Sequence, residues 1–304
     1  MNSAEKAPTA ANARCWVNAR LLQVFDQVSS CIDQGDAETA LPVLAGVLWT
    51  VEDKVAAHAL LRSHPLHSVL LEDPYTAQAF HKPRGYAGDA LVMDMIYDQV
   101  PPEGVTVRGR ELFAATTAYP VAQAVRSRRK LAAEVLEEAC SKDLRICSLA
   151  CGHMRELDNL AGRDCANITA IDQDGLSVEF VRRRHPTVDV RQMNVFEFLR
   201  SAISRGEKYD LIYSLGFTDY CDQREMNLLY KLMARCLAEH GTVFIANFAP
   251  NHLAQGWLEA CLDWRLIYRD EIVMRRHAEE HGLVSELWRD DTRSVVYSRM
   301  KRAA

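Results

Sequence analysis

The 304-residue chain lacks the features that mark several classes of protein. No apolar run approaches the ~18 residues that span a bilayer, and the first residues, MNSAEKAPTAANA, contain no apolar stretch of the secretory kind. We therefore expect a cytoplasmic protein without membrane insertion. Basic residues are not in excess either, because 36 Lys and Arg against 41 Asp and Glu give a net charge of −5. The composition therefore gives no reason to expect nucleic acid as a partner.

Paired cysteines, repeats and low-complexity tracts are also missing. The nine cysteines stand singly, and none forms a CxxC pair. Cys147 and Cys151 are close in the sequence, but no histidine or second cysteine pair completes a zinc set. We therefore expect reduced thiols and no metal site.

Helical periodicity dominates the first half of the chain, and strand signals are almost absent there. Apolar residues recur at helical spacing in four stretches, which are Val17–Val28, Leu41–Val55, Tyr86–Ile96 and Pro120–Leu136. The charges Arg126–Lys130 are expected to face outward from the last of these helices. We predict a flexible segment over residues 1–14 and an all-helical cap domain over residues 15–140.

After Cys140 strand and helix signals alternate. The strand candidates are Arg145–Ala150, Ile168–Asp172, Val188–Gln192, Tyr209–Ser214, Thr242–Phe248, Leu283–Trp288 and Ser294–Met300. The helical stretches between them are Leu157–Leu160 with its flanks, Leu176–Arg184, Val195–Ile203, Gln223–Ala238 and Asp270–His281. Alternation predicts a parallel sheet with right-handed crossovers, and the tight last connection predicts an antiparallel hairpin. Residues 141–304 therefore form one α/β domain.

Ligands of an open parallel sheet bind beyond the carboxyl ends of its strands. The first strand runs into a glycine turn in ICSLACGHMREL, residues 146–157, and the second ends at Asp172. A carboxylate at that position can accept both hydroxyls of a ribose, and we favour this role over that of a helix cap, which suits Asp174. Asn194 and Phe196 follow the third strand and can bracket an adenine ring. Asp219 lies in the loop after the fourth strand, where a substrate is expected.

This order of elements resembles the class I S-adenosylmethionine-dependent methyltransferases over roughly residues 140–300. Three segments, HKPRGYAGD (81–89), YSLGFTDY (213–220) and LDWRLIYR (262–269), resemble a bacterial subfamily that contains 3-hydroxy fatty acid methyl ester synthases and azetidine-2-carboxylate synthases. The resemblance implies a Rossmann-like, seven-stranded sheet and S-adenosylmethionine as methyl donor or as the substrate itself. It also implies that Arg84 and Tyr86 cover the cofactor as a lid.

The first loop departs from the family's acid-x-glycine-x-glycine-x-glycine pattern. Ser148 stands at the acid position, and Ala150, Gly152 and Met154 stand at the glycine positions. Ala150 fits this loop if its φ is negative. We interpret the segment as a cofactor loop with altered contacts to the methionine end of the ligand.

The candidate site residues fall into three groups. The cofactor contacts are Arg84, Ala150, Cys151, Gly152, Asp172, Gln173, Asn194, Val195, Phe196, Ser214, Leu215 and Gly216. The substrate contacts are Tyr97, Phe217, Asn247 and Phe248, and the catalytic candidates are Tyr86, Asp219 and Tyr220.

Two reactions and one non-catalytic role remain open at this point. Methyl transfer to a small or acyl carboxylic acid is the leading hypothesis, because an ionised carboxylate needs no base and no base is obvious. Intramolecular cyclisation of S-adenosylmethionine to azetidine-2-carboxylate and methylthioadenosine is the second. The third is a cofactor-binding module without turnover. A nicotinamide dehydrogenase is disfavoured by the terminal hairpin and by the lack of GxGxxG. Homodimerisation is left open.

Overall fold

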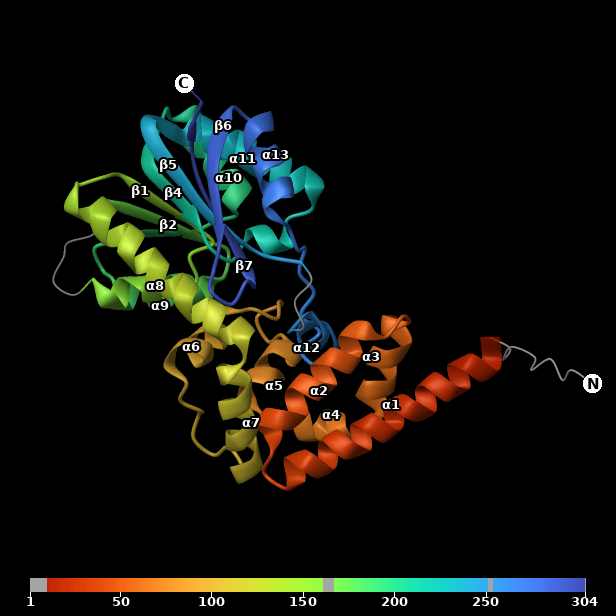
Figure 1. Cartoon of the computed structure of the whole chain (residues 1–304). Helices are drawn as coiled ribbons and strands as arrows, with labels where there is room; N and C mark the ends of the chain where they lie inside the picture. Colours follow the sequence, from red (N-terminus) through yellow and green to blue (C-terminus); the bar gives the residue numbers. More distant parts are fainter. Residues whose placement is uncertain (1–9, 161–166, 251–253, 304) are drawn as a thin grey trace, which may run out of the picture. The chain divides into compact units, whose positions relative to one another are not determined.

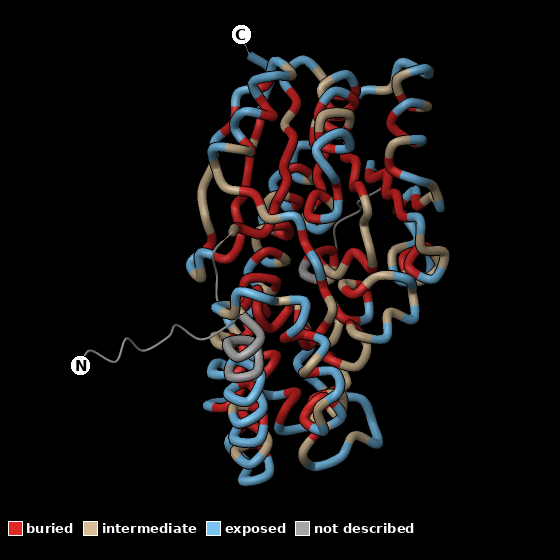
Figure 2. The backbone as a smooth tube through the Cα atoms, turned by 90° about the vertical axis from the view of Figure 1, so that its right-hand side faces the viewer, coloured by how far each residue is buried: buried red, intermediate tan, exposed pale blue. Residues whose placement is uncertain are grey.

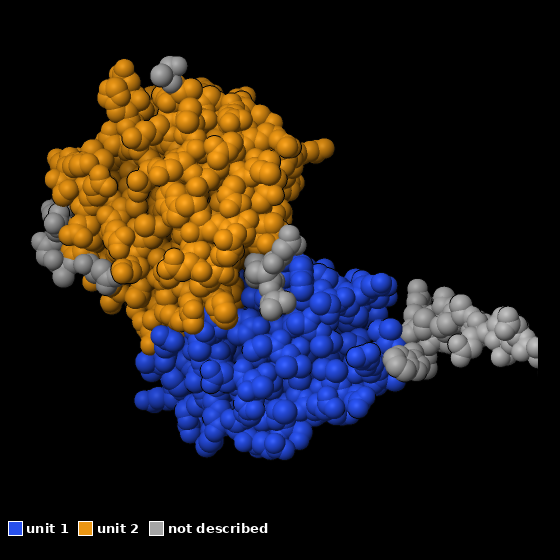
Figure 3. All heavy atoms as spheres, viewed as in Figure 1, with its two compact units in different colours: residues 1–88, 99–119, 253–265 blue, residues 89–98, 120–252, 266–304 orange. Residues whose placement is uncertain are grey.

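The computed structural model describes residues 10–160, 167–250 and 254–303. The chain forms two compact units (Figure 3). The helical unit comprises residues 1–88, 99–119 and 253–265, and the sheet unit comprises residues 89–98, 120–252 and 266–304. None of the described helices is both long and apolar enough to cross a membrane.

The helical unit is built from short capped helices and a segment from late in the chain. Its helices are α1 (Ala10–Asp33), α2 (Ala37–Thr50), α3 (Lys54–Ser63), α4 (Pro65–Leu70), α5 (Pro74–His81), α7 (Val107–Ala118) and α12 (Ala254–Ala260). Aspartates cap α2, α3 and α5, as expected for residues whose oxygens accept the free N–H groups of a first turn. Helix α12 packs against α2 so closely that a Cβ on Gly256 would lie 2.2 Å from the Ala45 carbonyl oxygen.

The sheet unit contains a seven-stranded sheet in the order β3-β2-β1-β4-β5-β7-β6 (Figure 1). Its strands are β1 (Ile146–Leu149), β2 (Ile168–Asp172), β3 (Asp189–Gln192), β4 (Tyr209–Ser214), β5 (Leu237–Phe248), β6 (Leu283–Arg289) and β7 (Val295–Arg302). The first five strands pair in parallel, whereas β7 pairs antiparallel with both β5 and β6. The predicted fold class is therefore confirmed, including the terminal antiparallel hairpin.

Helices cover both faces of this sheet (Figure 1). They are α8 (Pro120–Ser141), α9 (Gly175–Arg184), α10 (Val195–Ser204), α11 (Gln223–Cys236) and α13 (Glu271–Glu280). The sheet unit also contains α6 (Ala90–Asp98), which packs on α8, and the 3-10 turns η1 (Arg155–Asn159) and η2 (Thr218–Tyr220). The core lies between the strands and α10, α11 and α13, and the strands are mostly buried (Figure 2). This burial on both faces is typical of a largely parallel sheet.

Several boundaries differ from the sequence prediction. The expected helix over Leu41–Val55 is two helices, since α2 ends before Val51. The expected helix from Tyr86 begins instead at Ala90, and the helix expected after Gly152 is only the 3-10 turn η1. The strands Ile168–Asp172 and Tyr209–Ser214 are confirmed to the residue.

Candidate functional site

The loop after β1 adopts a left-handed backbone at alternate residues. Ala150, Gly152 and Met154 have φ values of +53°, +54° and +48°. The condition under which alanine fits this loop without strain, a negative φ at position 150, is therefore not met. A residue with a Cβ disfavours this conformation, because Cβ approaches the following carbonyl oxygen. The backbone is therefore left-handed at positions 150, 152 and 154, although only position 152 holds glycine.

Asp172, at the carboxyl end of β2, is bonded to this loop. One of its carboxylate oxygens accepts the Gly152 N–H at 2.8 Å, and the other accepts the Asp174 N–H at 2.9 Å. Its side chain is 5% exposed, and burial raises its pKa, against the opposing effect of these backbone hydrogen bonds. An ionised carboxylate offers about four lone-pair sites, so acceptor capacity for hydroxyl donors remains. Asp174 caps α9 by accepting the Leu176 N–H, as expected.

The loop after β3 begins α10. Asn194 caps this helix by accepting the Phe196 N–H at 2.9 Å, while Val195 is buried in the core. The Phe196 ring lies 5.9 Å from the Phe217 ring in the loop after β4. The residue predicted to contact adenine and the residue predicted to contact substrate therefore meet. Gln173 is exposed, and its carbonyl accepts a hydrogen bond from the Gln192 side chain.

The loop after β4 is held in place from several sides. The Ser214 hydroxyl donates to the Leu149 carbonyl at 2.8 Å, which ties β4 to β1. Leu215 is half-buried and Gly216 is exposed. Asp219 is 1% exposed and accepts the Phe248 N–H at 2.6 Å.

Burial raises the pKa of Asp219 to about 6. Its neighbour Tyr220, the other catalytic candidate in this loop, is exposed at 36%.

Arg269 organises this loop, although the sequence prediction did not include it among the site residues. Its guanidinium donates to the carbonyl oxygens of Thr218 and Cys221 and to the side-chain oxygen of Asn247. The amide of Asn247 in turn donates to the carbonyl oxygens of Phe248 and Ile267. The predicted substrate contact Asn247 is therefore buried and committed to this network. The quoted segment LDWRLIYR contained the missing signal, since Arg269 is its last residue.

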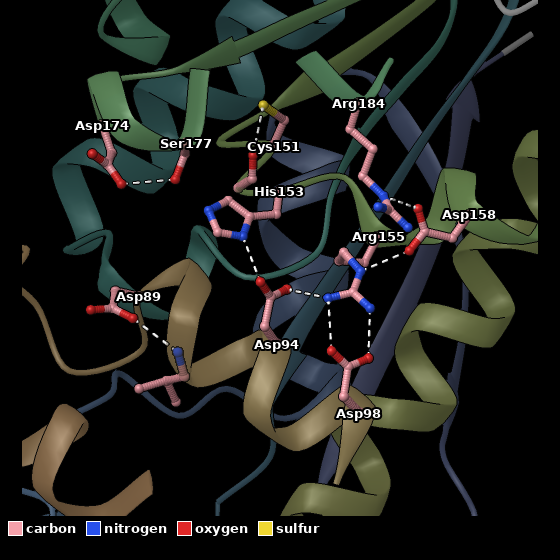
Figure 4. Close-up of polar contacts among 12 residues, drawn as sticks. Asp89, Asp94, Asp98, Cys151, His153, Arg155, Asp158, Asp174, Ser177 and Arg184 are labelled. Carbon is pink, nitrogen blue, oxygen red and sulfur yellow. Dashed lines mark hydrogen bonds and ion pairs between the residues drawn. The ribbon is translucent and has the colours of Figure 1, made fainter. Parts of the chain in front are cut away.

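A second network joins α6 to the loop after β1 (Figure 4). Asp94 accepts a hydrogen bond from His153 at 2.7 Å and pairs with Arg155 at 2.9 Å, and Arg155 also pairs with Asp98 and Asp158. The His153 ring stacks on Phe180 with centroids 3.9 Å apart. His153 is thus buried and engaged in structure, which leaves it poorly placed to act as a base.

Tyr97 and the remaining candidates fall in different units. Tyr97 of α6 is half-buried, with the Arg129 guanidinium 4.7 Å from its ring centre. Arg84 and Tyr86 belong to the helical unit, and both are half-buried. Asp89 accepts the Val92 N–H at 2.9 Å in the first turn of α6, which confirms it as a cap.

Arg128 is a further residue that the sequence prediction missed. We expected Arg126–Lys130 to face outward, but Arg128 is buried. It lies seven residues after Val121 and three after Val125, so it shares their buried helix face. This spacing was a usable signal. A Cβ built on Gly216 would lie 3.7 Å from Nη2 of Arg128, which places the guanidinium beside the loop after β4.

Metal-binding clusters and cavities were the other places where a ligand site could lie in the described part of the chain. Among the residues with described structure, no group of three or more His, Cys, Asp and Glu side chains is arranged to hold a metal ion. A cavity of 670 Å³ is lined by Gly206 and Lys208, which precede β4, and by Arg235 at the end of α11. It therefore lies at the amino end of β4, away from Asp172 and Gly216.

No family model and no curated protein matches the chain. Among solved structures, it is similar to a protein from Bordetella parapertussis described as a possible exported protein, with a TM-score of 0.60 and 18% identity over 99% of this chain and 100% of that one. It is less similar to magnesium protoporphyrin IX methyltransferase from Synechocystis PCC 6803 with bound S-adenosylhomocysteine (TM-score 0.45, 15% identity, 60% and 87% covered). The N-methyltransferase NodS from Bradyrhizobium japonicum WM9 has a TM-score of 0.43 at 15% identity, with 59% and 98% covered. At these identities the likeness concerns the fold.

Proposed function

We propose that the protein binds S-adenosylmethionine at the carboxyl edge of the sheet and transfers its methyl group to a carboxylic acid. One observation carries the proposal. The three alternate left-handed residues at 150, 152 and 154 form a turn whose Gly152 N–H is bonded to Asp172. This turn presents backbone to a ligand at the end of β1, and the acid stands where a ribose is expected. The segments HKPRGYAGD and YSLGFTDY resemble a subfamily that contains 3-hydroxy fatty acid methyl ester synthases and azetidine-2-carboxylate synthases, which supports S-adenosylmethionine as the ligand in either reaction.

In methyl transfer from a sulfonium, the main role of the protein is to position the two reactants. Methyl transfer from a sulfonium is one in-line displacement, so alignment of the acceptor and exclusion of water supply most of the catalysis. Aromatic faces stabilise a cation, and Phe196 and Phe217 meet beside the loop after β4. The acceptor oxygen forms the new bond to the methyl carbon while the carbon–sulfur bond breaks and leaves S-adenosylhomocysteine.

The acid–base groups near the site favour an acceptor that is already ionised. Asp219 is buried and accepts the Phe248 N–H, and His153 is paired with Asp94 and stacked on Phe180. Neither is placed to remove a proton from an alcohol or an amine. A carboxylate acceptor needs no such step.

The test is to incubate the protein with S-adenosylmethionine and medium-chain carboxylic acids, including 3-hydroxydecanoic acid, and to measure S-adenosylhomocysteine and the methyl ester. Asp172→Asn should weaken S-adenosylhomocysteine binding by about tenfold or more, because hydrogen bonds to a charged acceptor contribute about 1.5–3 kcal/mol. The matched control is Asp174→Asn, which alters a helix cap two residues away and should leave the affinity within about twofold. Equal affinities for both variants and the wild type would remove Asp172 from the cofactor site.

Cyclisation of S-adenosylmethionine is the second candidate, and a specific observation favours it. Ser148 replaces the acid of the first loop, and a buried acid that follows this loop, Glu156, accepts the Tyr213 hydroxyl at 2.8 Å. Burial raises the pKa of Glu156. A carboxyl group whose negative charge is disfavoured by burial holds a ligand amine in its ammonium form less strongly, and a neutral amine can attack the γ-carbon.

In that reaction the nitrogen–carbon bond forms, the carbon–sulfur bond breaks, and a proton passes to solvent. Mass spectrometry after incubation with S-adenosylmethionine alone distinguishes the outcomes. Methylthioadenosine together with azetidine-2-carboxylate would replace methyl transfer as the proposed activity. Binding without either product, with and without acids, would leave a non-catalytic module.

A further inference from the structure

Arg128 of α8 is a buried arginine with an unsatisfied donor. Its residue is 6% exposed, and its Nη1 has no hydrogen-bond partner. Nη2 contacts the sulfur of Met93 at 3.8 Å, and the guanidinium lies 5.8 Å from the centre of the Phe248 ring. A Cβ on Gly216 would lie 3.9 Å from Nη1, so the unsatisfied atom borders the loop after β4.

Two buried acids interact electrostatically with this guanidinium, but no hydrogen bond within the described part of the chain joins either of them to it. Glu156 accepts the Tyr213 hydroxyl, and Asp219 accepts the Phe248 N–H. Burial raises the pKa of both carboxyl groups, and Arg128 opposes that shift in both. A buried charge without a full set of partners is costly to the folded protein, and such a cost is commonly retained for function.

We propose that Arg128 binds a carboxylate group of a ligand that occupies the space beside Gly216. This inference rests on the proposed function. A guanidinium binds a carboxylate through two parallel hydrogen bonds, and Nη1 has a donor to contribute. Met93 and Phe248 give this place an apolar wall. A single negative charge with an apolar body fits these surroundings.

The carboxylate belongs either to the amino-acid end of S-adenosylmethionine or to the acceptor acid. Calorimetry of Arg128→Gln with S-adenosylhomocysteine and with methylthioadenosine separates these sources, because methylthioadenosine lacks the amino-acid end. If the cofactor supplies the carboxylate, Arg128→Gln weakens S-adenosylhomocysteine binding about 10- to 100-fold and leaves methylthioadenosine binding unchanged. The control is Arg126→Gln, a half-buried arginine on the same helix whose Nη1 donates to the Ile96 carbonyl.

The second arm uses the acceptor. The wild type saturated with S-adenosylhomocysteine is titrated with 3-hydroxydecanoic acid and with decane-1,3-diol, which lacks the carboxylate. If the acceptor supplies the group, Arg128→Gln reduces the affinity for the acid about 10- to 100-fold, and its affinity for S-adenosylhomocysteine equals that of the wild type.

A structural role for Arg128 predicts different behaviour. If Arg128 serves a ligand, removal of this buried, incompletely paired charge should leave the melting temperature of ligand-free Arg128→Met equal to or above that of the wild type. If Arg128 serves the fold, the melting temperature should fall. A lower melting temperature, with equal proportional losses for S-adenosylhomocysteine and methylthioadenosine, would overturn the inference. Wild-type affinities retained by Arg128→Gln for every ligand would overturn it too. Failure of the wild type to bind S-adenosylhomocysteine would instead refute the proposed function.

Discussion

Replacing Ala150 with glycine tests whether the loop after β1 stores backbone strain. At φ +53° an alanine costs roughly 1–2 kcal/mol relative to a right-handed conformation, and glycine removes this cost. Glycine also makes the unfolded chain more flexible, which costs about 0.4–1 kcal/mol. Loss of a half-buried methyl group costs about 0.4 kcal/mol, half of the ~0.8 for a fully buried one. The free energy of unfolding should therefore change by between about −0.4 and about +1.2 kcal/mol.

The matched control is Ala234→Gly in α11. Ala150 and Ala234 are both half-buried and both pack against the core of the sheet unit, but Ala234 is helical. Its replacement should lower the free energy of unfolding by about 1 kcal/mol or more, since glycine is poor in helices. Hydrogen exchange of slowly exchanging amides in β1 and β4 reports the opening of the sheet unit alone. Equal destabilisation by the two substitutions would refute strain at Ala150.

Two further predictions concern the loop after β4. The pKa of Asp219 is about 6 in the folded protein against an ordinary 3.8, so its contribution to stability is complete below pH 3.8 and is lost as the pH rises through 6. The free energy of unfolding of the wild type should fall between pH 4 and pH 7, and Asp219→Asn should reduce this fall by about 3 kcal/mol, at 1.36 kcal/mol per pH unit. An identical pH profile of the two proteins in urea unfolding would contradict the raised pKa of Asp219. Arg269→Lys should lower the free energy of unfolding by about 3 kcal/mol. A lysine cannot bond the carbonyl oxygens of Thr218 and Cys221 and the Asn247 side-chain oxygen together, and each buried oxygen left without a donor costs about 1–3 kcal/mol. The exposed Arg200→Lys serves as the control, and a similar small effect of both in thermal unfolding would show that the network around Arg269 contributes little.

The strands of the sheet unit were predictable because their signal is local. A buried parallel strand is a short apolar run between turns, and Ile168–Asp172 and Tyr209–Ser214 have that form. The turn η1 was mistaken for a longer helix because Met154, Leu157 and Leu160 are three residues apart. That spacing suits a 3-10 turn, which has three residues per turn, at least as well as an α-helix.

Packing between distant segments was not predictable in the same way. Helix α12 follows β5 in the chain, yet it packs on α2 in the helical unit. No periodicity within Ala254–Ala260 indicates that partner. Only the close approach of Gly256 to the Ala45 carbonyl, seen in the structure, explains the small residue there.

The sequence prediction missed two buried arginines at the candidate site. The hydrophobic pattern assigns arginines to the surface by default, and Arg128 and Arg269 are both buried. The acceptors in Thr218, Cys221 and Asn247 lie 22 to 51 positions before Arg269 in the chain, so its hydrogen bonds to them form only when the protein folds. Arg128 finds no comparable set of acceptors, and this difference separates an arginine that serves the fold from one that is available to a ligand.

The loop after β1 has a left-handed backbone at Ala150 and Met154, which are residue types that disfavour this conformation. Met154 is only 1% exposed, and burial of a methionine side chain contributes about 1.5–3 kcal/mol, which offsets its left-handed backbone. Ala150 has no side chain large enough to do the same, so the net strain of the loop is concentrated there. The hydrogen bond from the Gly152 N–H to Asp172 stabilises the turn, although Ala150 by itself would favour a right-handed backbone. If a ligand also binds these N–H groups, its binding and the strain at Ala150 oppose each other. Ala150→Gly should then bind S-adenosylhomocysteine at least as tightly as the wild type, and weaker binding in calorimetry would show that the loop requires alanine for a reason other than backbone shape.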